Sequence, residues 1–367
     1  MVVFIGHLGF FFPSAQRFGH LAHIAVCIFF VLSGFVIRMI TRTRVFSIQD
    51  FLIDRASRIY SVVIPALAFT FLCEAIGALL MHFGSHAQDS SISWGNVPVQ
   101  VIANLTFTAQ CWGYEANPLW NSPFWSLSFE CIYYVLFALL LYRKNNRFYG
   151  MLCALIAIIA GPAIVMLFPI WLAGCLTYDI YIWLDQKKYA FLLTSSCLAV
   201  TLAAAIVFRH PISYLLQVTD LVHREQWLQQ FFSPSLQSRL ADSTGLVPWL
   251  SRASFSFYIA GVITSVIILW SLITVDRFLP SFSPGMSRSI RWVAEGTFAL
   301  YLFHLPLILL LAMFFNGRPR APLACAAGIV VFCVVLSSYL DRLKIFMRNW
   351  LRRRYSSRQS PTQLEVT

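Results

Sequence analysis

Apolar stretches of about membrane length recur along the whole chain, separated by short polar segments. A transmembrane helix needs about 20 apolar residues, and most of these stretches come close to that length or exceed it. None alternates polar and apolar residues in the way of a membrane β-barrel strand. The long segments fall at 22–40, 59–83, 124–142, 164–184, 190–208, 254–275, 291–315 and 321–340, with shorter ones at 1–13 and 149–163. The pattern predicts an all-α, polytopic transmembrane helix bundle of about ten spans.

The first of these segments is too short to cross a bilayer. It covers 1–13, which is little more than half of the length that a span requires. The first span is therefore predicted to be truncated. We expect either that the true start lies upstream of Met1 or that this helix has half the usual length.

The composition supports a membrane protein, and this class of protein changes how the positive net charge is interpreted. The 367 residues are 59% hydrophobic and 11% charged, whereas about a quarter of a soluble domain is charged. A net charge of +12 would suggest nucleic acid as the partner of a soluble protein. In a membrane protein it reports loop topology and contact with anionic lipid, so no nucleic-acid partner is predicted.

The distribution of Lys and Arg predicts the topology. With successive spans alternating in direction, 20 of the 27 Lys and Arg residues fall on the side that carries both termini. The positive-inside rule assigns that side to the cytoplasm. We therefore divide the chain into a membrane domain at 1–345 and a basic, partly disordered cytoplasmic tail at 346–367. The nine cysteines form no C-x-x-C pair, and no metal site is predicted.

Two histidines, His7 and His304, lie inside apolar segments. An ionisable side chain at membrane depth is costly and is a functional-site candidate by default. A neutral imidazole can accept a proton from a hydroxyl near neutral pH, which makes histidine a natural general base. The alternative, a histidine that only forms hydrogen bonds within the bundle, stays open for both residues.

An arginine pair, Arg55 and Arg58, stands at the start of the segment predicted at 59–83. A spacing of three puts both guanidinium groups on one face of a helix. Guanidinium groups bind phosphate oxygens in a bidentate manner, so the pair would fit the phosphates of a nucleotide-bearing cofactor. The positive-inside rule alone could also explain it.

A third cluster of polar side chains opens the segment at 124–142. Trp125, Ser126 and Glu130 lie near its predicted outer end, with Glu130 roughly one to two turns beyond Pro123. A carboxylate at that depth needs a histidine, an arginine or its own proton. A histidine partner would have its imidazole oriented by the carboxylate. A fourth feature, Ser33-Gly34, is typical of a close approach of two helices.

Six motifs occur in order along the chain. They are Gly6-His7, FFVLSGFVI (29–37), FLIDRASRIY (51–60), FWSLSFECIYY (124–134), FPIWLAGCL (168–176) and FALYLFHLPLILL (298–310). Together they resemble the acyltransferase-3 family of integral membrane acyltransferases over nearly the whole chain. The basic residue that the family usually carries ahead of its first histidine would precede Met1, which agrees with an upstream start.

The resemblance implies an enzyme that moves an acyl group, usually acetyl, from acyl-CoA to a hydroxyl of a carbohydrate. The acceptor would be an exopolysaccharide, an O-antigen or a lipid-linked oligosaccharide, and the enzyme would lie in the bacterial cytoplasmic (inner) membrane. Acyl-CoA would be the co-substrate, with no metal; membrane lipid is a further partner, and a homo-oligomer is left open. The implied site residues are His7 and Glu130 for catalysis, Arg55 and Arg58 for the phosphates of CoA, and Trp125, Ser126 and His304 for the substrate. The histidine would act as a base or carry the acyl group transiently.

Two other classes of protein were weighed. A glycan or small-solute transporter, or a flippase, would use an embedded histidine and glutamate as a proton relay. Transporters are often built from repeated halves with interrupted helices, and no internal repeat is evident in this sequence. A purely structural scaffold gives no reason for six motifs in order.

Overall fold

The computed structural model describes residues 2–8, 19–44, 47–83, 97–114, 116–118, 120–142, 147–185, 187–207, 255–279, 283–315 and 321–359. Within these ranges the chain is helical and contains no strand. Residues 9–13 of the first predicted segment and 360–367 of the predicted tail lie outside them.

Seven helices in the described ranges are long and apolar enough to cross a membrane. They are α2 (Gly19–Thr43), α3 (Ile48–Phe83), α5 (Trp125–Tyr142), α7 (Pro162–Leu184), α13 (Phe255–Phe278), α14 (Pro284–Phe315) and α15 (Ala321–Gln359). The shorter helices are α1 (Val2–His7), α4 (Val97–Leu105), η4 (Cys111–Gly113), η5 (Ser122–Phe124), α6 (Arg147–Ala160) and α8 (Ala190–Val207). The prediction of a polytopic helix bundle is confirmed.

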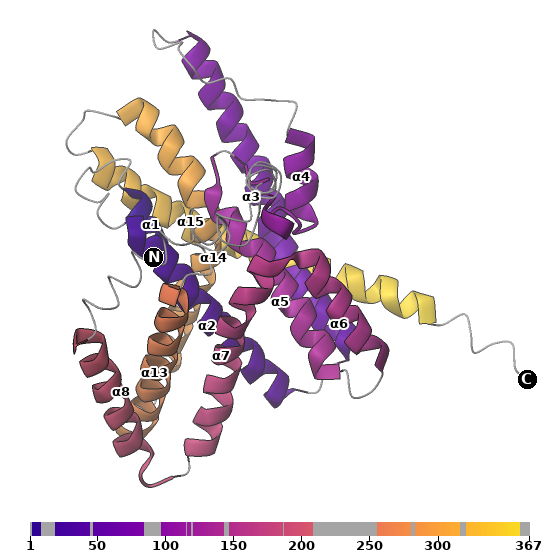
Figure 1. Ribbon diagram of the computed structural model, residues 1–367. Helices are drawn as coiled ribbons and strands as arrows, with labels where there is room; N and C mark the ends of the chain where they lie inside the picture. Colours follow the sequence, from indigo (N-terminus) through magenta and orange to yellow (C-terminus); the bar gives the residue numbers. More distant parts are fainter. Residues whose placement is uncertain are drawn as a thin grey trace, which may run out of the picture.

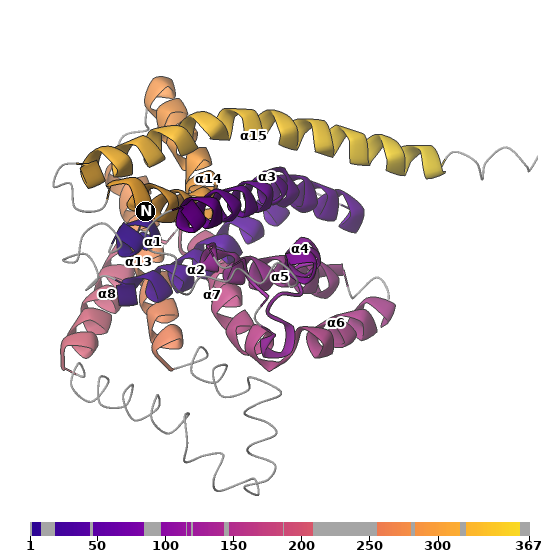
Figure 2. The ribbon, with the colours of Figure 1, turned by 90° about the horizontal axis from the view of Figure 1, so that it is seen from above.

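The helices form two groups that are linked through α1 and α5 (Figures 1 and 2). In one group α3, α14 and α15 pack against one another, and in the other α13 packs against both α7 and α8. α2 packs against α7 and α13, while α1 bridges α2 and α14. α5 contacts α3, α6 and α7. As a result α1, α2, α3, α5 and α14 surround a common interior space.

α3 begins earlier than the sequence predicted. Its first residue is Ile48, whereas hydrophobicity placed the start of the span at 59. The reason is a local cap: the Asp50 N–H donates to Ser47 Oγ at 3.1 Å, and Ser47 Oγ donates to Asp50 Oδ2 at 2.7 Å. Side-chain caps of this kind satisfy free N–H groups and start a helix in polar sequence. Arg55 and Arg58 therefore lie inside the helix, directly ahead of its apolar segment.

α2 and α7 approach each other backbone to backbone. A Cβ atom on Gly34 would lie 1.9 Å from the carbonyl oxygen of Trp171, and one on Gly174 would lie 1.9 Å from that of Val31. Only glycine permits such an approach. The close helix contact predicted at Ser33-Gly34 is confirmed, and α7 is its partner.

α15 is one unbroken helix of 39 residues. It runs through residue 345, where the sequence suggested the end of the membrane domain, and continues to Gln359. Its C-terminal part projects beyond the other helices (Figures 1 and 2). At 1.5 Å per residue the helix is roughly 58 Å long, well beyond the thickness of a hydrocarbon core.

Candidate active site

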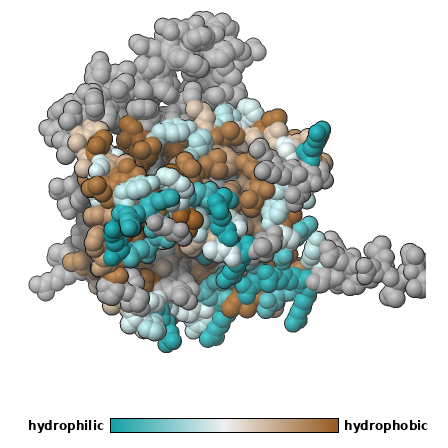
Figure 3. Space-filling model, turned by 90° about the horizontal axis from the view of Figure 1, so that it is seen from below, coloured by the Kyte–Doolittle hydropathy of each residue, from teal (hydrophilic) through white to brown (hydrophobic). Residues whose placement is uncertain are grey.

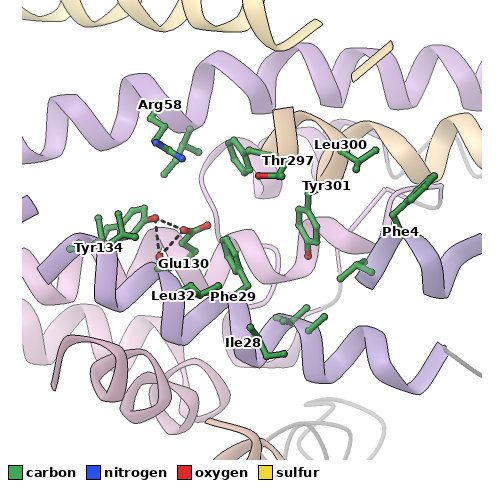
Figure 4. A pocket seen from close by; sticks show the side chains of 18 of the residues that line it. Phe4, Ile28, Phe29, Leu32, Arg58, Glu130, Tyr134, Thr297, Leu300 and Tyr301 are labelled. Atoms are coloured by element: carbon green, nitrogen blue, oxygen red, sulfur yellow. Dashed lines mark hydrogen bonds between the residues drawn. The ribbon is translucent and has the colours of Figure 1, made fainter. Parts of the chain in front are cut away.

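The interior space is a cavity of about 440 Å³ bounded by α1, α2, α3, α5 and α14. One side of α2 from Ala25 to Ile37 contributes to its wall, a length of roughly 18 Å. Apolar side chains make up most of the lining. The polar ones are Ser33, Arg55, Arg58, Glu130, Tyr134, Thr297, Tyr301 and His304. Figure 4 shows Arg58, Glu130 and Tyr134 toward one end of the cavity and Phe4 toward the other.

His7 and His304 are brought into direct contact. His7 Nδ1 lies 2.8 Å from His304 Nε2, and the two rings stack with centroids 5.1 Å apart. His304 is fully buried and lines the cavity, whereas His7 is half-buried at the end of α1. The two embedded histidines of the sequence therefore form one unit.

The surroundings of His304 define which nitrogen of the pair is basic. His304 Nδ1 lies 2.9 Å from the carbonyl oxygen of Leu300 and 3.0 Å from that of Tyr301. A carbonyl only accepts, so the network assigns the proton of neutral His304 to Nδ1 and leaves a lone pair on Nε2. His7 must then donate through its Nδ1–H. The basic nitrogen of His7 is Nε2, on the side of its ring away from His304 Nε2.

A proline in α14 helps to anchor this region. Pro306 has no N–H and leaves the carbonyl of Leu302, four residues earlier, without its helical donor. Asn121 Nδ2 donates to that carbonyl at 2.8 Å and lies equally close to Thr70 Oγ1. The loop before α5 is thereby tied to α14 two residues before His304.

Glu130 is buried and held by hydroxyl groups. Its Oε1 accepts a hydrogen bond from Ser33 Oγ at 3.0 Å and another from the Tyr134 hydroxyl (Figure 4). Ser33 Oγ in turn accepts from Trp171 Nε1 at 3.2 Å. Of the partners left open by the sequence, the histidine is not the one observed, because the hydrogen bonds of Glu130 go to Ser33 and Tyr134. Arg58 is near enough to stabilise the carboxylate electrostatically.

Arg55 and Arg58 both line the cavity, as their spacing of three allows. In the described part of the chain neither guanidinium forms an ion pair or donates a hydrogen bond, and Arg55 Nε is buried. Arg58 is exposed and Arg55 is half-buried, so both guanidinium groups keep N–H donors available for an anion that enters the cavity. Three other described arginines are paired: Arg38 and Arg42 contact Asp179, and Arg352 contacts Asp54.

Trp125 and Ser126 stand behind the cavity wall. Neither belongs to the residues that line it. Ser126 Oγ lies 2.6 Å from the hydroxyl of Tyr301, whose side chain does line the cavity. Trp125 packs edge-on against Phe129, with ring centroids 5.2 Å apart. Their predicted contact with substrate would therefore be indirect in this conformation.

Three functional candidates escaped the sequence analysis: Ser33, Tyr134 and Tyr301. Ser33 was interpreted only as a packing residue. Tyr134 follows Glu130 by four positions, one helical turn, and this spacing was a usable signal. Tyr301 precedes His304 by three positions on the same face of α14. The described residues contain no group of three His, Cys, Asp or Glu side chains that could hold a metal ion.

These features define a polytopic helical membrane protein with one cavity that is lined by an arginine pair and by His304, which contacts His7. A family model described as an acyltransferase domain, that of the acyltransferase-3 family, matches residues 1–340. The chain belongs to this family and is a membrane acyltransferase. No curated protein and no solved structure matches the chain. Family membership favours acyl transfer over the transporter or flippase considered above.

Proposed function

We propose that the protein transfers an acyl group, in the first instance acetyl, from acyl-CoA to a hydroxyl of a carbohydrate. Exopolysaccharide, O-antigen and lipid-linked oligosaccharide are the acceptors of choice. The enzyme would act in the bacterial cytoplasmic membrane, with both termini in the cytoplasm. The acyl donor would enter beside Arg55 and Arg58, and the acceptor would approach His7.

One observation carries this proposal: a single cavity is lined both by two arginines that form no ion pair within the described residues and by His304, the buried member of the histidine pair. Arg55 and Arg58 line the same cavity as His304, whose Nε2 accepts from His7. The wall between them is mostly apolar, with a length of roughly 18 Å along α2. Acyl-CoA has an extended thioester arm with phosphates at one end. This molecule fits an elongated apolar cavity with arginines at one end.

The proposed chemistry uses Nε2 of His7. The acceptor hydroxyl gives its proton to Nε2, and its oxygen attacks the thioester carbonyl. A C–O bond forms, the C–S bond breaks, and the proton moves from Nε2 to the departing thiolate, which leaves free CoA and an ester. His304 keeps the Nδ1–H of His7 occupied and stabilises the imidazolium while Nε2 carries the proton. A transient acyl-histidine would use the same nitrogen.

Replacement of His7 tests the acyl-transfer step. Membranes that contain His7→Ala receive acetyl-CoA labelled in the acetyl group, and label in the glycan fraction is counted. Transfer should fall by at least about 100-fold, the usual contribution of a general base. Ile5→Ala, on an exposed position of the same helix, serves as the control and should retain activity. Acetylated glycan at an undiminished level in His7→Ala would overturn the assignment.

Replacement of the arginine pair tests the donor site. Arg55→Gln with Arg58→Gln should raise the KM for acetyl-CoA by at least about tenfold, because charge-assisted hydrogen bonds to phosphate are lost. Arg42→Gln with Arg44→Gln removes the same charge from two exposed positions outside the cavity. The control should leave the KM unchanged. An equal KM in both double variants would remove the arginine pair from the donor site.

A further inference from the structure

A second, smaller cavity adjoins the first between α3, α14 and α15. It measures about 40 Å³, and Arg58 and Phe298 line both cavities. The remaining lining residues are Ser61, Val62, Ala299, Ser337, Leu340, Asp341 and Lys344. Arg58 therefore stands on the boundary between the main cavity and the junction of α3 with α15.

A row of charged side chains continues from this cavity along α15. Asp341, Lys344, Arg348 and Arg352 follow one another at intervals of three or four residues, so they share one face of the helix. Contacts with α3 fix the direction of that face. Lys344 lines the cavity with Arg58, and Arg352 Nη2 lies 3.2 Å from Asp54 Oδ1. We call this junction, with Arg58, Lys344 and Arg348 as its cations, the α3–α15 seam.

Positive charge in the α3–α15 seam is only partly compensated. Arg352 is paired with Asp54, and Lys344 contacts Asp341. Arg348 Nε is buried and has no hydrogen-bond partner, and Arg58 forms no ion pair within the described residues. Arg348 Nε is thus kept from water without a partner, which is costly. Together with the exposed guanidinium of Arg58 and with Lys344, it favours a ligand with more than one negative charge.

We propose that the α3–α15 seam binds phosphate groups of the acyl donor, with Lys344 and Arg348 as binding residues. The inference rests on the proposed function, since it assumes a nucleotide thioester as donor. Coenzyme A carries a diphosphate and a separate ribose phosphate, so a row of cations suits it better than one pair. The thioester arm passes Arg58 and Phe298 into the main cavity. Lys344 and Arg348 lie beyond residue 340, where the family match ends.

An anionic lipid headgroup offers the same phosphate chemistry, but two observations favour the donor. Arg348 Nε is buried between helices, whereas Arg342 and Arg353 on other sides of α15 are exposed. The seam also opens beside the main cavity at Arg58. Figure 3 shows the many hydrophilic side chains along the projecting part of α15, next to the grey C-terminal residues. The exposed arginines are the ones suited to lipid.

The test measures binding by full-length protein in nanodiscs of neutral lipid. Calorimetry gives the Kd for CoA, for dephospho-CoA without the ribose phosphate, and for pantetheine without any phosphate. Lys344→Gln with Arg348→Gln should weaken CoA binding by at least about tenfold and leave pantetheine binding unchanged. Arg342→Gln with Arg353→Gln, which removes the same charge from the exposed sides of α15, should change neither. Lys344→Arg with Arg348→Lys retains both charges and should keep most of the affinity.

Several results would overturn the proposal. One is an unchanged Kd for CoA in Lys344→Gln with Arg348→Gln, and another is an equal loss of pantetheine binding. If this variant keeps its CoA affinity but loses retention on phosphatidylglycerol vesicles, the phosphates come from lipid and not from the donor. Failure of the proposed function is separate: the wild-type protein would then transfer no acetyl from acetyl-CoA. If Lys344→Gln with Arg348→Gln transfers acetyl with an unaltered KM for acetyl-CoA, only the proposal for the α3–α15 seam is overturned.

Discussion

His7 and His304, which are 297 positions apart in the chain, meet through a 2.8 Å contact between Nδ1 of the first and Nε2 of the second. His304 is held by two backbone carbonyls, so under the proposed function it would act on the reaction through His7. The pair resembles the histidine and carboxylate of hydrolase triads in its logic, since one group orients the other. Here a neutral imidazole takes the place of the carboxylate.

The first prediction concerns His304. His304→Ala removes the acceptor of the His7 Nδ1–H, and kcat should fall by roughly 10- to 100-fold because the ring of His7 is no longer oriented. The KM for acetyl-CoA should change little. His304→Gln, which offers a side-chain oxygen as acceptor, should recover part of the loss. Steady-state kinetics of the purified enzyme separate the two constants, and equal kcat values for the alanine variant and the wild type would contradict the orienting role.

A second prediction concerns the hydroxyl groups around Glu130. Tyr134→Phe and Ser33→Ala each leave one lone pair of a buried carboxylate without a donor. Each should lower the free energy of unfolding by about 1–3 kcal/mol. Because both groups bond to Oε1, the double variant should deviate from additivity by at least about 0.5 kcal/mol. Thermal unfolding in detergent gives the stabilities of the wild type, the two single variants and the double variant. Strict additivity of the two losses would count against a shared hydrogen-bond network.

A third prediction concerns the close approach of α2 and α7 at Gly34, with glycines in open positions as matched controls. Gly34→Ala would place a Cβ atom 1.9 Å from a backbone oxygen of α7, so the two helices must separate. The variant should lose more than about 2 kcal/mol of stability or fail to accumulate. Gly150→Ala and Gly328→Ala meet nothing within 4 Å and should be neutral or stabilise their helices by up to about 1 kcal/mol. Expression level and melting temperature distinguish the outcomes; a Gly34→Ala protein as stable as the controls would refute the close approach.

A fourth prediction concerns the tie between the loop before α5 and α14. Asn121→Leu removes the donor to the carbonyl that Pro306 leaves free, which should cost about 1–3 kcal/mol. Pro306→Ala restores a helical N–H and should reduce the cost of Asn121→Leu when the two are combined. Melting temperatures of both single variants and the double variant test this, and a full cost of Asn121→Leu in the Pro306→Ala background would disprove the link.

The sequence was informative where one local rule decides the outcome. Ser33-Gly34 predicted a close helix contact, and the long apolar segments predicted the bundle. Hydrophobicity located the apolar part of α3 but not the start of the helix, because a Ser47 cap extends the helix through polar sequence. No local pattern could reveal that His7 lies beside His304, or that Glu130 bonds to Ser33, since these partners lie on different helices. Such pairings depend on how the helices pack, and that depends on the whole chain.

The contact between Gly34 and Gly174 gives the cavity two unlike sides. On the α2 side, backbone touches backbone, and no side chain can change rotamer to let the helices shift. On the α14 side the contacts are made by side chains, and Pro306 interrupts the hydrogen bonding of the helix one turn from the histidine pair. The α2 side of the cavity is therefore held by backbone contact, whereas the α14 side is held by a side chain, that of Asn121. Under the proposed function, we expect a bulky acceptor to be admitted by movement of α14, which carries His304, and not by separation of α2 from α7.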